Sequence, residues 1–327
     1  IAAVAAAGFV AERGDRAEAP PFQPVAALPQ LAGKLGDLAW MRLTRGAMKA
    51  DFGAIGGRWA VVEKENYPAS PGRVRRLLAG LADLRLIEPK TKRAELLARL
   101  DLDDPKNGKA TLVQLQDRSG ATVAELIVGK SRPDLLGSGD GGVYVRKPGS
   151  DQAWLARGAL DVSGAIADWL DRLIVDVPAS RIVSVALTGA DGAALVLRRD
   201  APGGGFTVAD APAEAKFKDE TALQAPAAAL ADLELDDVRP AAVLPVPEGG
   251  VARAVFTTAD GLTVTLRLVE RDNVDWVAVE AAGSGAAAAE AKDINARVGR
   301  WRYAIPVARA KLLRTRLDDL LQPAKGS

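Results

Sequence analysis

The stretch Arg58-Trp-Ala-Val-Val-Glu-Lys-Glu-Asn-Tyr-Pro-Ala-Ser-Pro71 predicts a strand that leads directly into a helix. Residues 58–63 are rich in aromatic and β-branched side chains, as expected of a strand. Ser70 is typical of a helix N-cap, and Pro71 suits the first helical position. The apolar side chains that follow recur at spacings of three and four, the pattern of one buried helix face: Val74, Leu77, Leu78, Leu81 and Leu84.

Two strands are predicted before this stretch, and the same order of elements recurs in the second half of the chain. The predicted strands are 38–45 and 48–52 in the first half, and 181–188, 193–199 and 203–209 in the second. Asp219 is expected to cap a helix whose end, Leu230-Ala-Asp-Leu233, repeats Leu81-Ala-Asp-Leu84. The pattern indicates an internal duplication.

A third, partial unit is predicted at the end of the chain. Arg300-Trp-Arg-Tyr-Ala-Ile-Pro306 is similar to residues 58–68 and precedes a predicted helix over 307–321. We interpret the aromatic and proline residues of the three units as structural or interface anchors between a strand and its covering helix: Trp59, Tyr67, Pro68, Phe206, Trp301, Tyr303 and Pro306. The alternative is an exposed aromatic platform for a glycan or a protein partner.

Strand runs followed by helices favour an α+β fold with antiparallel sheets. Further hairpins are predicted at Ser119-Gly120 and Asp260-Gly261. We therefore expect duplicated antiparallel-sheet-plus-helix units, with a third partial unit at the C-terminus. The predicted domains are a first α+β unit at 35–178 and a second at 179–327, which includes the C-terminal strand–helix element.

The first residues predict a membrane attachment. Residues 1–11 are apolar without a break and would span about 16 Å as a helix, roughly half of a bilayer core. Because the chain begins with Ile1, we expect this run to be the end of an N-terminal membrane helix or signal segment. Residues 12–34 are charged and then proline-rich, which predicts a linker. The alternative is an Ala-rich helix that packs within the fold.

Composition excludes several kinds of chemistry. The chain has no histidine and no cysteine, so histidine-based acid–base catalysis, Ser–His–Asp and Cys–His nucleophiles, disulfides and thiolate or imidazole metal sites are absent. Its 43 Lys and Arg against 42 Asp and Glu leave a net charge of +1, so no nucleic-acid partner is expected.

Three short motifs resemble ligand sites but lack the necessary spacing. Gly129-Lys-Ser131 has alanine at position 124, where a phosphate loop needs glycine. The acids of Asp101-Leu-Asp-Asp-Pro-Lys-Asn-Gly108 do not follow a calcium-loop register. Gly137-Ser-Gly-Asp-Gly-Gly142 lies between predicted strands and suits a hairpin tip. We therefore predict no catalytic, cofactor-binding or metal-binding residue.

Basic residues gather in two parts of the chain. One group lies in the first predicted helix and beyond it: Arg73, Arg75, Arg76, Arg85, Lys90, Lys92, Arg93 and Arg99. The other lies near the end of the chain: Arg297, Arg300, Arg302, Arg309, Lys311, Arg314 and Arg316. We interpret both groups as solvated faces, and the alternative is attraction to anionic lipid headgroups or to an acidic partner.

The motifs together resemble a bacterial family over residues 38–233. They are Trp59, Tyr67-Pro-Ala69, Leu81-Ala-Asp-Leu84, Leu100-Asp-Leu-Asp-Asp-Pro105, Ile127-Val-Gly-Lys130, Gly142-Val-Tyr-Val-Arg146 and Trp154-Leu155. The family consists of uncharacterised extracytoplasmic domains encoded beside gliding-motility-type ABC transporter subunits. The resemblance implies one N-terminal membrane helix in the bacterial inner membrane, a periplasmic folded part, and ABC permease and ATPase subunits as partners. It transfers no catalytic residue.

Three functions follow as hypotheses. The first is a non-enzymatic, membrane-anchored accessory subunit of an ABC-type transport system, which acts as a scaffold or ligand-presenting surface. The second is a binding module for a cell-envelope glycan, with an exposed ring such as Trp40, Trp154 or Trp276. The third is a carboxylate-based hydrolase, which needs two acids that converge in a pocket.

Overall fold

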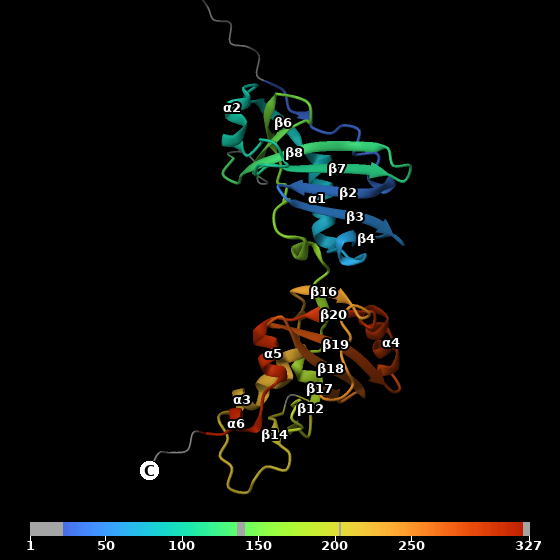
Figure 1. Ribbon diagram of the computed structural model, residues 1–327, viewed down its shortest axis with the longest axis vertical. Helices are drawn as coiled ribbons and strands as arrows, with labels where there is room; N and C mark the ends of the chain where they lie inside the picture. Colours follow the sequence, from blue (N-terminus) through green and yellow to red (C-terminus); the bar gives the residue numbers. More distant parts are fainter. Residues whose placement is uncertain (1–21, 136–140, 203, 323–327) are drawn as a thin grey trace, which may run out of the picture.

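Two antiparallel sheets follow one another along the long axis of the molecule in the computed structural model (Figure 1). The structure describes residues 22–135, 141–202 and 204–322. The predicted membrane segment 1–11 and part of the Gly137–Gly142 motif lie outside these residues. Within the described ranges, no helix combines the length and the apolar character needed to span a membrane.

The first sheet has ten strands in the described part of the chain, in the order β1-β6-β10-β9-β8-β7-β2-β3-β4-β5. They are β1 (Val25–Ala26), β2 (Leu38–Arg45), β3 (Met48–Ile55), β4 (Arg58–Val61), β5 (Tyr67–Pro68), β6 (Arg85–Pro89), β7 (Thr111–Asp117), β8 (Thr122–Arg132), β9 (Gly142–Arg146) and β10 (Ala153–Arg157). The helical segments around it are η1 (Leu35–Asp37), η2 (Val62–Lys64), α1 (Pro71–Asp83), α2 (Ala94–Leu97), η3 (Ala98–Leu100) and η4 (Ile166–Trp169).

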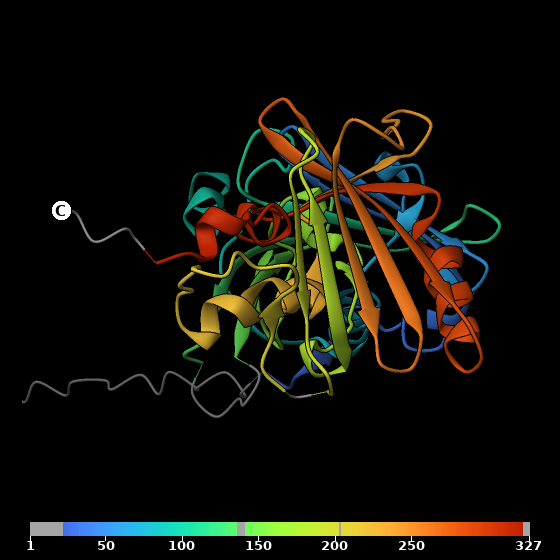
Figure 2. The ribbon, with the colours of Figure 1, turned by 90° about the horizontal axis from the view of Figure 1, so that it is seen from below.

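The second sheet has eight described strands, in the order β14-β13-β12-β17-β18-β19-β20-β16. They are β12 (Ile182–Thr188), β13 (Ala194–Arg198), β14 (Thr207–Val208), β16 (Asp237–Pro240), β17 (Ala252–Thr258), β18 (Leu262–Arg271), β19 (Val274–Gly283) and β20 (Trp301–Ala304). The accompanying helical segments are η5 (Ala179–Arg181), α3 (Glu220–Gln224), η6 (Ala225–Leu230), α4 (Ala287–Val298), α5 (Val307–Leu313) and α6 (Leu317–Leu320). Seen from below, β17, β18 and β19 run side by side in orange (Figure 2).

The two sheets share their strand order. Eight strands of the first sheet lie in the order β4-β3-β2-β7-β8-β9-β10-β6. The strands of the second sheet lie in the corresponding order, β14-β13-β12-β17-β18-β19-β20-β16. The first sheet has β1 and β5 in addition. A small third sheet lies between them, in which β11 (Leu173–Val175) pairs with β15 (Leu233–Glu234). This pairing ties the segment that leaves the first sheet to a segment within the second half.

The predicted α+β class is wrong, because the described chain is mostly antiparallel β-sheet with few and short helices. The helix expected after Asp219 is interrupted at Pro226, so the five-residue α3 passes into the 3₁₀ segment η6. Proline lacks the amide hydrogen that a continuing α-helix needs. The helix expected over 307–321 is likewise divided into α5 and α6.

The C-terminal element is not a third unit, which corrects the second part of that prediction. β20 is a strand of the second sheet, where Tyr303 is opposite Val277 of β19 and Val238 of β16. Its aromatic residues therefore complete an existing sheet. The similarity to residues 58–68 reflects a strand with inward-facing aromatic rings.

Helix α1 forms as the local sequence predicts. The Ser70 hydroxyl accepts a hydrogen bond from the Arg73 amide at 3.5 Å, and Pro71 is the first helical residue. Val74, Leu77, Leu78 and Leu81 are buried on one face. Their side chains belong to a contiguous cluster of buried residues that extends through both sheets. The helix is therefore held mainly by burial of this face.

Gly129 lies inside β8, so the Gly129-Lys-Ser131 motif is part of a strand. A Cβ atom at this position would lie 2.3 Å from the Leu100 carbonyl oxygen. Such an approach is far inside van der Waals contact, and the obstructing atom is backbone. Glycine here allows η3 and the turn after it to lie directly on the sheet.

We expect Gly129→Ala to lower the free energy of unfolding by about 1–3 kcal/mol, the cost of overfilling a close-packed site. Gly53→Ala is the matched control, because Gly53 also lies in a strand, β3, and nothing lies within 4 Å of its Cβ position. Urea unfolding followed by circular dichroism measures both. Equal stability of the two variants would contradict the close approach.

Candidate binding site at the junction of the two sheets

A buried aromatic cluster joins the first sheet to the second. The Tyr67 ring of β5 lies 5.1 Å from the Trp301 ring and 6.2 Å from the Tyr303 ring of β20, centroid to centroid, with edge-to-face geometry in both pairs. Tyr67 is 4% exposed and Tyr303 is 1% exposed. Edge-to-face pairs are favourable beyond the area that they bury.

The hydroxyl groups of this cluster lie near one another. The Tyr67 hydroxyl donates to the Asp171 carbonyl oxygen at 3.1 Å, and the Tyr67 and Tyr303 hydroxyls each affect the pKa of the other. Burial raises the pKa of both tyrosine hydroxyls above the ordinary value. Both groups therefore stay protonated and able to donate over the physiological pH range.

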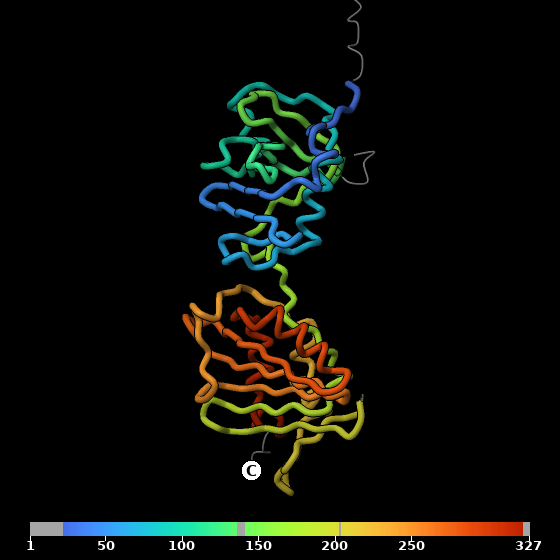
Figure 3. The backbone as a smooth tube through the Cα atoms, turned by 90° about the vertical axis from the view of Figure 1, so that its right-hand side faces the viewer, coloured from blue at the N-terminus to red at the C-terminus, as the bar shows by residue number. Residues whose placement is uncertain are grey.

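Polar contacts flank the aromatic cluster. Lys64 forms an ion pair with Asp237 of β16, and Arg297 of α4 donates to the Ile174 carbonyl oxygen at 3.0 Å. Arg172 donates to the Leu235 carbonyl oxygen at 3.1 Å. Figure 3 shows the single segment of chain, in green, that passes between the two sheets at this junction. Side chains on both sides of that segment thus bind the sheets to each other.

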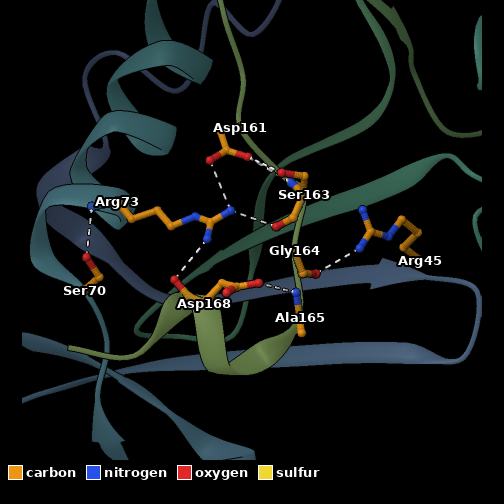
Figure 4. Close-up of polar contacts among 8 residues, drawn as sticks. All are labelled: Arg45, Ser70, Arg73, Asp161, Ser163, Gly164, Ala165 and Asp168. Carbon is orange, nitrogen blue, oxygen red and sulfur yellow. Dashed lines mark hydrogen bonds and ion pairs between the residues drawn. The ribbon is translucent and has the colours of Figure 1, made fainter. Parts of the chain in front are cut away.

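The segment that reaches the junction is held against α1 by Arg73 (Figure 4). Arg73 donates to the carbonyl oxygens of Asp168 and Ser163, at 3.0 and 2.8 Å, and pairs with Asp161. Its guanidinium group also lies 4.2 Å from the centre of the Trp169 ring, which is fully buried. These contacts define the path of the chain just before Asp171.

A pocket of about 700 Å³ opens beside the aromatic cluster. The residues that line it are Leu35, Gly57, Arg58, Trp59, Tyr67, Pro68, Ala69, Pro71, Val74, Arg75, Leu78, Ala79, Asp171, Leu173 and Arg297. Most of these side chains are apolar or aromatic, and the charged ones are three arginines and one aspartate. Its volume falls within the ~300–1,000 Å³ that is usual for small-molecule sites.

The turn between β3 and β4 brings two lining residues to the pocket. Gly56 and Gly57 have φ angles of +57° and +80°, and they connect the paired residues Ile55 and Arg58. A two-residue turn with positive φ at both positions fits the twist of a hairpin and favours glycine. Arg58 and Trp59 follow this turn directly.

The charges of the pocket do not cancel. Burial raises the pKa of Asp171 above its ordinary value, and the positive charges of Arg297 and Arg58 oppose that rise. Among the residues that the structure describes, Arg58 and Arg75 form no ion pair and no side-chain hydrogen bond. The lining therefore carries an excess of positive charge.

A comparison with known protein families matches residues 59–249 to the family described as domain of unknown function DUF4340, which is more than half of the chain. The chain belongs to the DUF4340 family. Comparison with curated proteins gave no match, and comparison with solved structures gave none either. The DUF4340 match includes Tyr67 and Asp171, whereas Arg297, Trp301 and Tyr303 lie beyond it.

Five of the seven predicted anchors gather at this junction of the DUF4340 chain. Trp59, Tyr67 and Pro68 line the pocket, and Trp301 and Tyr303 lie behind Tyr67. Phe206 is buried in the second half, with the Arg199 guanidinium 4.6 Å from its ring centre. Pro306 precedes α5 as its N-cap residue.

Sequence reasoning did not identify Asp171, Leu173 or the role of the pocket arginines. Arg75 and Arg297 belong to the two basic groups of the sequence. Those groups were the one sequence feature that could have pointed to the positive charge of the pocket. Nothing in the residues around Asp171 marks that carboxylate, because its position depends on the path of the connecting segment. The described lining includes one carboxylate, and a carboxylate-based hydrolase needs a second.

The acidic motif 101–108 and the tryptophans Trp154 and Trp276 make the contacts of a turn and of a packed interior. Asp103 accepts hydrogen bonds from the Lys109 and Ala110 amides, and Asp104 accepts one from Lys106, as in a turn. Within the described ranges, no group of three or more acids is arranged to hold a metal ion. Trp276 is buried, and the Trp154 ring contacts that of Phe22 at 5.3 Å.

We expect Tyr67→Phe to lower the free energy of unfolding by about 1–3 kcal/mol, because it removes the hydrogen bond to the Asp171 carbonyl oxygen and the polar group beside the buried Tyr303 hydroxyl. Tyr303→Phe removes one hydroxyl donor and should lower the free energy of unfolding by less than Tyr67→Phe. Urea unfolding measures both variants.

Tyr144→Phe is the matched control, since among the described residues its hydroxyl accepts from Arg132 alone, a side chain that water reaches. Its stability should change by less than about 0.5 kcal/mol. The double variant Tyr67→Phe/Tyr303→Phe should lose less than the two single losses combined. Additive losses would show that the two hydroxyls are not coupled.

Proposed function

We propose that this DUF4340 chain is a non-enzymatic accessory subunit of a bacterial ABC-type transport system, anchored in the inner membrane with its folded part in the periplasm, and that it presents a bound ligand from the junction pocket. The observation that carries the proposal is the pocket itself. Its walls share residues with the cluster that joins the two sheets, so the binding surface is formed before a ligand arrives. A preformed surface lowers the entropic cost of binding.

The resemblance of the chain to domains encoded beside ABC transporter subunits supports the choice of partner. It suggests the permease and the ATPase as the subunits with which the chain associates. The mostly β architecture supports a presenting role, because the two sheets follow one another along the long axis and form an extended body. The anchor and the periplasmic location belong to the same proposal.

A glycan-binding role is the second candidate, and one side chain favours it. Trp40 of β2 is half-buried, and the Arg42 guanidinium lies 5.7 Å from the centre of its ring. A partly open ring beside a polar side chain is a usual feature of sugar sites. On this alternative, Trp40→Ala would abolish binding to isolated cell-envelope polymer, whereas a change in the junction pocket would not.

The proposal predicts that the full-length protein, isolated with an affinity tag from the membranes of its own cell in mild detergent, brings an ABC ATPase and a permease with it. Quantitative mass spectrometry should find both subunits in amounts comparable to the tagged chain. An unrelated periplasmic protein with one membrane helix and the same tag provides the control. Recovery of the tagged chain without transporter subunits would contradict the proposal.

A further inference from the structure

We propose that the junction pocket binds an amphiphilic anion, a molecule with an acidic head and an apolar tail. The proposal deepens the role given above, because it names the chemical class of the presented ligand. It rests on two features of the lining, its apolar walls and its unpaired arginines.

The walls of the pocket match an apolar tail. Val74 and Leu78 of α1 line it from the buried face of that helix, and Trp59 and Leu173 line it from other segments. Leu173 is 39% exposed, so part of its apolar side chain is open to water at the pocket. Contact with an apolar tail would remove this surface from water, which favours binding.

The charges of the pocket match an acidic head. Arg58, Arg75 and Arg297 come from three different elements, β4, α1 and α4, and they line the same pocket. Arg297 already donates to a backbone oxygen, and the positive charges of both Arg297 and Arg58 act on Asp171. Arg58 and Arg75 form no ion pair and no side-chain hydrogen bond with a described residue. A guanidinium group binds carboxylate and phosphate oxygens through two parallel hydrogen bonds.

The combination selects against other ligand classes. A neutral lipid or sugar would leave the arginine charges without a counter-ion. A cationic amphiphile would meet the excess of positive charge. A small inorganic anion would leave the apolar walls exposed to water. An amphiphilic anion satisfies both parts of the lining together.

Isothermal titration calorimetry on the 327-residue chain tests the proposal with decyl probes below their micelle concentrations. Decanoate and decyl phosphate should bind, and their relative affinities distinguish a fatty-acid carboxylate from a lipid phosphate as the natural head. Decyltrimethylammonium, decyl maltoside and acetate should bind at least about tenfold more weakly. Equal binding of the anionic, cationic and neutral decyl probes would overturn the proposal. A failure of both decanoate and decyl phosphate to bind would also overturn it.

Arg75→Gln and Arg76→Gln are matched variants, because the two residues are neighbours on the exposed side of α1 and only Arg75 lines the pocket. Arg75→Gln should weaken decanoate binding about tenfold, and Arg76→Gln by less than about twofold. Asp171→Asn should strengthen it, because it removes the negative charge of the pocket. Equal effects of the two arginine variants would place the anion elsewhere.

The outcome is independent of the transporter experiment. Ligand binding is measured on the isolated chain, and association with transporter subunits is measured in membranes. Binding of decanoate without recovery of transporter subunits would refute the proposed partner and leave the pocket ligand standing. Recovery of the subunits without binding of any anionic probe would refute the ligand alone.

Discussion

The contact of Tyr67 with Trp301 and Tyr303 is the interaction on which the rest of the molecule depends. It brings the edge strand β5 of the first sheet against β20, the last strand of the chain, and the Tyr67 hydroxyl fixes the backbone at Asp171. Aromatic rings supply a large buried area, and a hydroxyl at the ring edge supplies a directional bond. The contact therefore holds both the distance between the sheets and the position of the connecting segment.

The pocket follows from this contact. Tyr67 and Asp171 are both lining residues, so the same groups join the sheets and form the wall of the site. Asp171 is tolerated there because Arg297 and Arg58 offset the cost of its burial. The remaining positive charge is directed toward the pocket. A site built in this way is rigid, since loosening it would require the sheets to separate.

Local features of this fold could be predicted from the sequence, and long-range ones could not. Ser70 and Pro71 start α1 as expected, and hairpins form at Ser119-Gly120 and Asp260-Gly261. The α+β class was wrong. The Asp219 cap and the Leu230-Ala-Asp-Leu233 end suggested one helix through Pro226, where the structure has a five-residue α-helix and a 3₁₀ segment. Hydrophobic periodicity indicates which face of a helix or strand is apolar, but it does not indicate which other element packs against that face. Tyr67 and Trp301 were therefore recognised separately as buried anchors, and their contact across the junction was not foreseen.

The central claim is that the buried aromatic junction makes the two sheets one cooperative body, and differential scanning calorimetry of the whole chain tests it most directly. The account predicts a single unfolding transition whose calorimetric and van't Hoff enthalpies agree. Trp301→Ala should divide that transition into two. Two separate transitions in the unaltered chain would contradict the account, because they would show that the two sheets unfold independently.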